Sequence, residues 1–395
     1  MRVCVHCSNR KNPPYQTNAV TPCNLGMARE HSNSEEVVLA AEVGHARLIT
    51  LNRPRQLNVI SSRVVFLLAQ FLEKWEKDDD SKLVIFKGAG RAFCAGGDLK
   101  MFYEGRKDDS CLEVVYRMYW LCYHIHTYKK PMVALANGIV MGGGASMVVP
   151  AKISVVTEKT VFSMPEASIG LHTDCSFSYI LPRLPGYLGE FLALTSARLN
   201  GKEMIAAGLA THFVPSEKLH ELENRLVNLS STDEDSIRAI VEEFSLNVPP
   251  DEESILNKLS TIDKCFCEES VEEIIKSFEA ESKMDGNEWI SPILKGLKRS
   301  SPTGLKITLK SIRRGRKRTL AECLKNEFRL TMNLLRSVIS SDVYEWNPSS
   351  LQQVSREKVD LVFEPFADEL ELQIPTDEKS RWSGKYEDTV YPSLE

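Results

Sequence analysis

Two glycine-rich stretches, at 88–98 and 137–144, each follow a run of apolar residues that resembles a strand. Glycine is unfavourable inside a regular element, so such stretches mark backbone that turns sharply or approaches another group closely. Two of them at strand ends can present two backbone N–H groups to one developing negative charge, which is the minimum needed to stabilise an oxyanion. The pattern therefore predicts an enzyme that acts on an activated carbonyl group.

The second stretch contains three consecutive glycines, Gly142, Gly143 and Gly144, at the start of a predicted helix. The first N–H groups of a helix have no intrahelical acceptor, and Gly143 has no Cβ to keep a substrate away from them. A flexible junction between core elements is the alternative interpretation of either stretch. Neither carries the Gly-Lys-Ser/Thr ending of a phosphate-binding loop or the full Gly-x-Gly-x-x-Gly spacing of a dinucleotide site.

Two carboxylates follow another apolar strand-like run. Glu166 is flanked by Met, Pro and Ala, and Asp174 follows in the segment Gly170-Leu171-His172-Thr173-Asp174. Partial desolvation by such neighbours raises the pKa of an acid toward the range useful for proton transfer. The alternative for each residue is a helix cap or a surface acid.

The elements that must position these residues alternate between strand and helix. Strands are predicted at 36–41, 46–51, 83–86, 132–136 and 153–156, and helices at 61–75, 112–128 and 145–149. This order implies crossover connections and a largely parallel sheet. The chain beyond about residue 186 is predicted to be helical, with a linker at 247–250 and a helix that begins at Ser301-Pro302.

Composition excludes several classes of function. The chain has 395 residues and a net charge of −5, without a basic stripe for nucleic acid; the cluster 313–318 is interpreted as a solvated junction between helices. No apolar run is long enough to span a bilayer. The ten cysteines are irregularly spaced, as free thiols of a reducing compartment are, and Cys4-Val5-His6-Cys7 lacks the second pair that a zinc site needs.

Four ordered segments resemble the crotonase (enoyl-CoA hydratase/isomerase) superfamily. They are Asn52-Arg53-Pro54 with Leu57-Asn58, the run 92–98, Gly138 with 141–144, and Met164-Pro165-Glu166 with Ile169-Gly170. Further segments at 181–184, 192–195, 210–214 and 301–303 are similar to the 3-hydroxyisobutyryl-CoA hydrolase branch, and above all to its plant, mitochondrially assigned hydrolase-like members. The resemblance covers roughly residues 36–375.

The resemblance implies an α/β fold, a crotonase-like spiral of ββα units with a helical C-terminal extension. The expected divisions are a leader at 1–35, a crotonase core at 36–245, a helical extension at 246–375 and a flexible tail at 376–395. The basic, acid-poor leader is either a transit peptide or a disordered tail with Met27 as the working start. A mitochondrial location is expected, with the cytoplasm or peroxisome as alternatives, for a monomer or small homo-oligomer.

The resemblance also implies a set of site residues. Gly97 and Gly143 are the expected oxyanion donors, Glu166 the catalytic glutamate, and Asp174 the aspartate near the substrate hydroxyl. The residues expected to bind the acyl-CoA are Ala95, whose carbonyl would accept from the adenine, and Gly96, Asp98, Met118 and Gly142. Glu166 would activate water or attack the thioester directly, and both routes stay open. No metal or cofactor is expected, because coenzyme A is part of the substrate.

Two departures from the family pattern stand out. Family hydrolases often carry a glutamate where this chain has Met118, whose alternative role is to fill the core. A segment that usually lies between Tyr-Glu and Lys-Trp-x-Pro is missing, because Tyr344-Glu345 runs directly into Trp346-Asn347-Pro348. Such a gap would shorten the helical cap over the coenzyme A site, as in a splice variant of reduced activity.

The implied function is that of an acyl-CoA thioester hydrolase, which converts 3-hydroxyisobutyryl-CoA to 3-hydroxyisobutyrate and coenzyme A in valine catabolism. An enoyl-CoA hydratase or isomerase is the first alternative, disfavoured because Ala145-Ser146-Met147 offers no acid after the triple glycine. A catalytically weak structural subunit of a mitochondrial assembly is the second.

Overall fold

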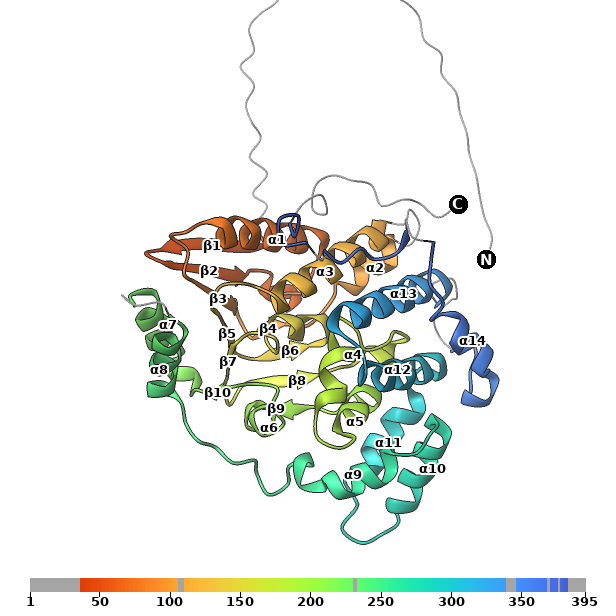
Figure 1. The fold of residues 1–395 in the computed structure, drawn as a ribbon. Coiled ribbons are helices and arrows are strands. Elements are labelled where there is room, and N and C mark those ends of the chain that lie inside the picture. Colours follow the sequence, from red (N-terminus) through yellow and green to blue (C-terminus); the bar gives the residue numbers. More distant parts are fainter. Residues whose placement is uncertain are drawn as a thin grey trace, which may run out of the picture. The chain divides into compact units, whose positions relative to one another are not determined.

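Three consecutive ββα units form the centre of the fold in this computed structural model, and each gives one strand to each of two sheets (Figure 1). The strand pairs are β3 (Leu83–Gly88) and β4 (Ala92–Cys94), β5 (Met132–Ala136) and β6 (Ile139–Met141), and β7 (Ile153–Val156) and β8 (Val161–Ser163). The structure describes residues 36–105, 110–229, 233–338, 346–367, 370–375 and 377–382. The predicted ββα spiral is therefore confirmed.

The sheets have different strand orders. The first strand of each unit joins a six-stranded sheet, β1-β2-β3-β5-β7-β10, which is completed by β1 (Val38–Val43), β2 (Ala46–Leu51) and β10 (His212–Phe213). Only the β1–β2 hairpin in it is antiparallel. The second strands form a four-stranded sheet, β4-β6-β8-β9, in which β9 (Leu199–Asn200) is antiparallel to β8 and the others are parallel. The carboxyl ends of β4, β6 and β8 therefore meet at one edge.

Helices cover both sheets and make up most of the second half of the chain. The α-helices are α1 (Ser62–Lys77), α2 (Leu99–Gly105), α3 (Ser110–His126), α4 (Phe177–Ile180), α5 (Leu188–Thr195), α6 (Gly201–Ala206), α7 (Leu219–Val227), α8 (Glu234–Phe244), α9 (Leu259–Phe266), α10 (Val271–Glu281), α11 (Ile290–Arg299), α12 (Pro302–Gly315), α13 (Leu320–Val338) and α14 (Arg356–Leu361). The 3₁₀ helices are η1 (Pro54–Gln56), η2 (Gly142–Met147), η3 (Glu166–Ile169), η4 (Leu181–Arg183), η5 (Ser216–Lys218), η6 (Ile255–Lys258) and η7 (Leu351–Gln353).

Because side chains alternate along the strands, the six-stranded sheet has a separate apolar cluster on each face. In β3, Leu83 and Ile85 belong to a cluster that includes side chains of α7 and α8, which lie on the outer face of the six-stranded sheet (Figure 1). Val84 and Phe86 point the other way, into the large core shared with α1, α3 and the C-terminal helices. Successive side chains of a strand face opposite sides, so a sheet buried on both faces needs the continuous apolar runs that this sequence has.

Most of the predicted elements are confirmed, and the second sheet is the main omission. The strands at 46–51, 132–136 and 153–156 agree with β2, β5 and β7, and the predicted helix at 61–75 with α1. Strands β4 and β6 span three residues each beside glycines, too few to show an alternating pattern. The helix expected at 145–149 is instead η2, which begins within the triple glycine at Gly142, a residue with a φ of 51°.

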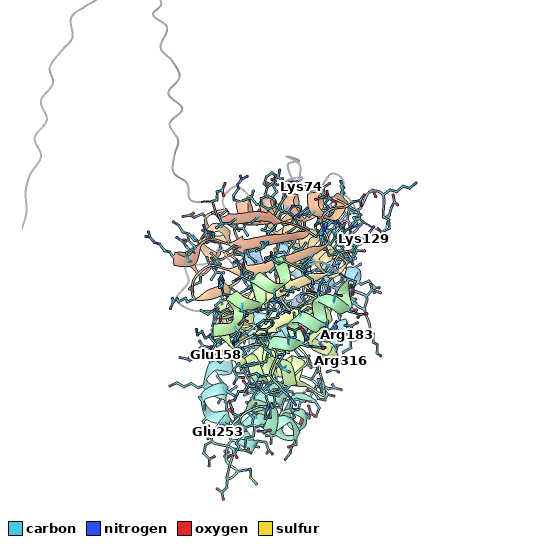
Figure 2. All side chains as sticks on the ribbon, turned by 90° about the vertical axis from the view of Figure 1, so that its left-hand side faces the viewer. Lys74, Lys129, Glu158, Arg183, Glu253 and Arg316 are labelled. Carbon is cyan, nitrogen blue, oxygen red and sulfur yellow. The ribbon has the colours of Figure 1, made fainter. Side chains whose placement is uncertain are left out.

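The basic cluster at 313–318 is more than the predicted solvated junction. Arg316 donates to Oε1 of the fully buried Glu190 at 2.7 Å, and Arg313 donates to the carbonyl of Phe266 at 2.8 Å. Arg183, labelled with Arg316 in Figure 2, donates to the carbonyl of Gly315 at 3.2 Å. These guanidinium groups bind the C-terminal end of α12 to its neighbours. The predicted start of that helix is confirmed, since the Ser301 hydroxyl accepts the N–H of Gly304.

The structure describes none of the predicted leader and only part of the predicted tail. The predicted leader at 1–35, with Cys4, His6 and Cys7, lies outside the described residues, as do Tyr344-Glu345 of the predicted C-terminal gap and most of the predicted tail. Within that tail, Arg381 pairs with Glu76 at 2.9 Å and Trp382 stacks on His124, while the flexibility of the tail stays a prediction. The division between core and extension at 245/246 stays a prediction.

Neither a membrane-spanning helix nor a metal-binding cluster occurs among the described residues. None of the described helices combines the length and the apolar composition that a membrane span requires. Within the same ranges, no group of three or more His, Cys, Asp or Glu side chains is arranged to hold a metal ion.

Candidate active site

A cavity of about 660 Å³ lies where β4, β6 and β8 end. Helices α3 and α13 contribute the opposite wall, so the site combines the ββα units with a helix from the C-terminal half of the chain. Ligands of parallel sheets commonly bind at the carboxyl ends of the strands. The cavity lining includes every residue predicted for the site, namely Ala95, Gly96, Gly97, Asp98, Met118, Gly142, Gly143, Glu166 and Asp174.

The first glycine stretch offers the N–H of Gly97. A parallel bridge joins Gly97 to Ile60, and it uses the carbonyl of Gly96 and the N–H of Asp98, at 2.8 and 2.9 Å. Since a residue in such a bridge directs its own N–H away from the partner strand, the Gly97 N–H stays available. It has no hydrogen-bond partner among the residues that the structure describes, and Gly97 lines the cavity.

The second glycine stretch lies directly beside the first. Gly143 is the second residue of η2, where an N–H group has no acceptor within the helix. A Cβ added to Gly96, which has a φ of 97°, would lie 3.2 Å from the Met141 carbonyl oxygen and 3.7 Å from the Gly143 nitrogen. This close approach brings two backbone N–H groups, of Gly97 and Gly143, to one end of the cavity.

Glu166 is the first residue of η3 and reaches back toward the triple glycine. A Cβ on Gly142 would lie only 2.5 Å from its Oε1 atom, so this approach requires glycine. Oε2 is buried and has no hydrogen-bond partner in the described part of the chain. Burial raises the pKa of the Glu166 carboxyl well above its usual value, and the nearby Asp174 adds to the rise. Glu166 is thus a buried acid with a free oxygen, as proton transfer requires.

Asp174 lies in the loop between η3 and α4, and a buried network holds it there. The Tyr119 hydroxyl donates to Oδ2 of Asp174 at 2.6 Å and lies 2.8 Å from Oγ1 of Thr331. The same Thr331 oxygen lies 2.8 Å from Nε2 of His172. Tyr119, on α3, and Thr331, on α13, both line the cavity.

Glu327, on α13, fixes the rest of that loop. Cys175 and Ser176 have φ angles of 53° and 77°, in the left-handed region that non-glycine residues rarely adopt. The two carboxylate oxygens of Glu327 accept the N–H groups of Ser176 and Ser178, each at 2.8 Å. Because these bonds hold Ser176 itself and Ser178 just after it, they stabilise the turn that follows Asp174. Burial raises the pKa of Glu327 to about 8.

The raised pKa of Glu327 predicts how stability depends on pH. Between the unfolded value of 4.5 and the folded value of about 8, the folded chain keeps a proton that the unfolded chain has released. The free energy of unfolding therefore falls as pH rises through this window, by at most about 5 kcal/mol, because each pH unit in it contributes about 1.4 kcal/mol. Denaturant unfolding at several pH values should show this fall in the wild type.

Glu327→Gln is the matched variant for this prediction. It should be less stable at every pH, because an amide offers one acceptor oxygen to two N–H groups. Its stability should nevertheless change less between pH values of about 5 and about 8, where it has lost the titrating carboxyl. Equal pH slopes for the two proteins would show that Glu327 is not the group responsible.

The remaining predicted residues also line the cavity. Met118 is buried on α3 beside Val114 and faces a lining that includes Leu335, so it contributes apolar surface. The Asp98 carboxylate pairs with Arg53 at 3.0 Å, and both residues line the cavity. Ala95 donates its N–H to the carbonyl of Leu57 at 3.0 Å.

Sequence reasoning missed Tyr119, Thr331 and Glu327. The first two are 212 residues apart in the chain, and neither stands in a glycine-rich or acidic motif. Their meeting depends on α3 packing against α13. For Glu327, a single acid in an amphipathic helix gives no sign that it is buried. No local pattern in the sequence marked any of these three residues as part of the site.

Taken together, the cavity holds two N–H donors, a buried acid and an anchored carboxylate. Such a set can stabilise negative charge on a carbonyl oxygen while the acid moves a proton to or from an attacking water. The anchored Asp174 can accept a hydrogen bond from a polar group on the substrate.

Comparison with known proteins gives concordant results. Residues 46–363 match the enoyl-CoA hydratase/isomerase family. The chain is 63% identical to 3-hydroxyisobutyryl-CoA hydrolase-like protein 5 of Arabidopsis thaliana, over 93% of this chain and all of the relative. It is 38% identical to the mitochondrial 3-hydroxyisobutyryl-CoA hydrolase of Homo sapiens, over 88% of this chain and 93% of the relative.

Two further similar proteins carry names that indicate other functions. The small ribosomal subunit protein mS47 of Arabidopsis thaliana is 39% identical over 87% of this chain and 89% of its own length. Among solved structures, a carnitinyl-CoA dehydratase from Mycobacterium thermoresistibile superposes with a TM-score of 0.79 at 32% identity, over 87% of this chain and 100% of that one.

Proposed function

The chain belongs to the enoyl-CoA hydratase/isomerase family, and on this premise we propose that it is an acyl-CoA thioesterase, with 3-hydroxyisobutyryl-CoA as its substrate in valine catabolism. The observation that carries the proposal is Glu166, a buried carboxyl with one unpartnered oxygen, beside the two glycine N–H groups of the same cavity. The names of the hydrolase and hydrolase-like relatives support the same reaction class.

The proposed reaction begins with the thioester carbonyl oxygen at the N–H groups of Gly97 and Gly143. Glu166 takes a proton from water as the water oxygen attacks the carbonyl carbon, and the two N–H groups stabilise the resulting oxyanion. When the tetrahedral intermediate collapses, the carbon–sulfur bond breaks and Glu166 returns the proton to the coenzyme A sulfur. The products are a carboxylic acid and free coenzyme A.

Direct attack by Glu166 on the carbonyl carbon is the other route to the same products. It would form a transient anhydride and release coenzyme A before water enters. Neither route changes an oxidation state, so the proposal includes no redox cofactor. In both routes Asp174 accepts a hydrogen bond from the 3-hydroxyl group of the acyl chain.

Release of free thiol from a panel of acyl-CoA substrates tests the proposal. Hydrolysis should be fastest with 3-hydroxyisobutyryl-CoA, and coenzyme A should appear in step with the acid. Hydration of an enoyl-CoA without release of thiol would favour the hydratase alternative. That alternative lacks support at the expected place, because the residues after the triple glycine are the buried Ala145, Ser146 and Met147.

A structural role is the second candidate function, and the similarity to ribosomal protein mS47 is the observation that favours it. The chain would then keep the fold and cavity while contributing a surface to a large particle. Co-sedimentation of the full chain with such a particle, together with background-level thiol release, would support this role over catalysis.

We also propose that the protein acts in mitochondria, as the name of its human relative indicates for that protein. Expression of the full chain and of a chain that starts at Met27, each fused at its C-terminus to a fluorescent protein, tests this location. The proposal expects mitochondrial signal from the full chain and its loss from the shorter one.

Met118 is proposed to form an apolar wall of the acyl site and to take no part in proton transfer. Met118→Leu should therefore retain kcat and KM within about threefold, because this exchange conserves apolar volume. Met118→Ala should widen the site and shift preference toward bulkier acyl groups by roughly tenfold. Steady-state kinetics on acyl-CoA substrates of increasing size measure both effects. A large loss in Met118→Leu would contradict a purely apolar role.

A further inference from the structure

Three polar side chains, Tyr119, Thr331 and His172, form a hydrogen-bonded line that begins at Asp174 in the cavity wall. The line runs from Oδ2 of Asp174 to the Tyr119 hydroxyl at 2.6 Å, from there to Oγ1 of Thr331 at 2.8 Å, and on to Nε2 of His172 at 2.8 Å. All three supporting side chains are buried, with Tyr119 and His172 each only 1% exposed. The line is therefore shielded from bulk solvent, and only Tyr119 and Thr331 of the three border the cavity.

Counting protons fixes the direction of every bond in this line. The Tyr119 hydroxyl has one hydrogen, and Asp174 receives it, so Thr331 must be the donor in the bond between the two hydroxyls. The Thr331 hydrogen is then used, which makes His172 the donor in the last bond. The contact of Thr331 with Oδ2 of Asp174, at 3.5 Å, is too long to compete for that hydrogen.

The histidine at the far end must therefore carry its proton on Nε2. Burial lowers the pKa of His172, so the ring is neutral near neutral pH and holds a single proton. Its Nδ1 atom lies 3.1 Å from the carbonyl oxygen of Thr173, which can only accept, so the two contacts compete for the single proton of the neutral ring, and the 2.8 Å contact with Thr331 is the shorter. The chain of donors points in one direction, from His172 through Thr331 and Tyr119 to the carboxylate.

We propose that Tyr119, Thr331 and His172 are positioning residues that occupy Oδ2 of Asp174 and thereby aim Oδ1 at the hydroxyl group of a 3-hydroxyacyl substrate. The inference rests on the proposed thioesterase function. Oδ1 has no hydrogen-bond partner among the described residues, and Asp174 is half-buried in the cavity wall. A short bond from a buried hydroxyl to one oxygen prevents the carboxylate from rotating, so the other oxygen keeps its direction.

Under this proposal, Tyr119, Thr331 and His172 determine which class of substrate the enzyme prefers. A site that holds a correctly aimed acceptor favours a substrate with the matching hydroxyl over one without it. When the Asp174 carboxylate is free to rotate, the enzyme loses this preference for hydroxylated substrates, while the oxyanion donors and Glu166 remain in place. The expected signature is therefore a loss confined to hydroxylated substrates.

Tyr119→Phe, assayed on 3-hydroxyisobutyryl-CoA and on isobutyryl-CoA, tests this signature. The wild type should prefer the hydroxylated substrate. The variant should lose roughly 10- to 100-fold in kcat/KM on that substrate, mostly through KM, and less than about threefold on isobutyryl-CoA. Tyr128→Phe is the matched control, since it also removes a buried tyrosine hydroxyl, one that donates to the Leu72 carbonyl at 2.8 Å outside the cavity lining. The control should change neither value.

Three kinetic outcomes would overturn the inference. They are an equal loss on both substrates, an unchanged preference in Tyr119→Phe, and a wild type that does not prefer the hydroxylated substrate. The first would show a merely structural role, and the other two would show that Oδ1 is not aimed at a substrate hydroxyl.

The tautomer of His172 gives a second test that needs no turnover. Nitrogen-15 NMR of the full chain labelled at histidine, with the signal assigned by its loss in His172→Gln, should show the proton on Nε2. A proton on Nδ1 would reverse the deduced direction and overturn the proposal. If the wild type releases no thiol although His172 carries the Nε2 proton, the thioesterase proposal fails. The positioning role is then decided by equilibrium binding of both thioesters to the wild type and to Tyr119→Phe.

Discussion

Replacing Glu166 by glutamine is expected to reduce kcat for thioester hydrolysis by about 10²–10⁴-fold, because an amide neither accepts the proton of the attacking water nor returns one to the leaving sulfur. The fold should survive the change. Burial disfavours a charge at this position, as the raised pKa of Glu166 shows, so an uncharged glutamine of nearly the same shape should be accommodated. KM should change little, since in the proposed mechanism Glu166 acts on the reacting atoms and not on the coenzyme A portion.

The measurement is steady-state release of free thiol by purified wild type and variant at matched concentration. Glu158→Gln is a suitable control, because Glu158 (labelled in Figure 2) accepts hydrogen bonds from Ser216 at the surface, away from the cavity. The control should retain full activity. Undiminished activity in Glu166→Gln would mean that another group handles the proton.

The second large effect is expected from a single added methyl group at Gly142. In Gly142→Ala the new Cβ would lie 2.5 Å from Oε1 of Glu166, and that carboxylate is the end of a flexible side chain that can move aside. A displacement of roughly 1 Å is enough to reduce catalysis by about 10²-fold. Activity should fall by at least this factor while the protein remains folded.

Gly208→Ala separates this displacement from backbone strain. Gly142 and Gly208 have positive φ angles of 51° and 75°, so alanine at either position loses about 1–2 kcal/mol of stability. At Gly208, however, no atom lies within 4 Å of the added Cβ. Similar losses of stability with activity lost only in Gly142→Ala would support the proposed geometry; equal activities in the two variants would refute the close approach of Glu166.

The residues at strand ends were predictable from sequence because each stands in a local pattern. Gly97, Gly143 and Glu166 directly follow short apolar runs, and parallel strands bring their carboxyl ends to one edge of a sheet. The family resemblance then assigned a role to each. The structure places all of them around one cavity, while their catalytic roles stay predictions until the variants are measured.

The support of the site was not predictable in the same way. Tyr119 and Thr331 meet across the packing of α3 against α13, and hydrophobic periodicity shows only that each helix has a buried face. Which polar side chain is buried within such a face depends on tertiary contacts. The four-stranded sheet was missed for a related reason, since β4 and β6 are too short to show a period of two.

Met118 stands where family hydrolases often carry a glutamate, and the structure shows what surrounds it. A methionine at this position cannot transfer protons, yet the cavity around it still holds Glu166, Asp174 and both glycine N–H groups. The Tyr119 hydroxyl, one residue further along α3, supplies the polar contact to Asp174. The proposed chemistry therefore does not depend on a glutamate in α3.

The most direct test of the central claim is release of free coenzyme A thiol when the purified full chain is given 3-hydroxyisobutyryl-CoA. The thioesterase account predicts many turnovers per protein molecule, with 3-hydroxyisobutyrate formed in equal amount and the rate reduced to near background in Glu166→Gln. Background-level release by the wild type, or equal release by wild type and Glu166→Gln, would contradict it.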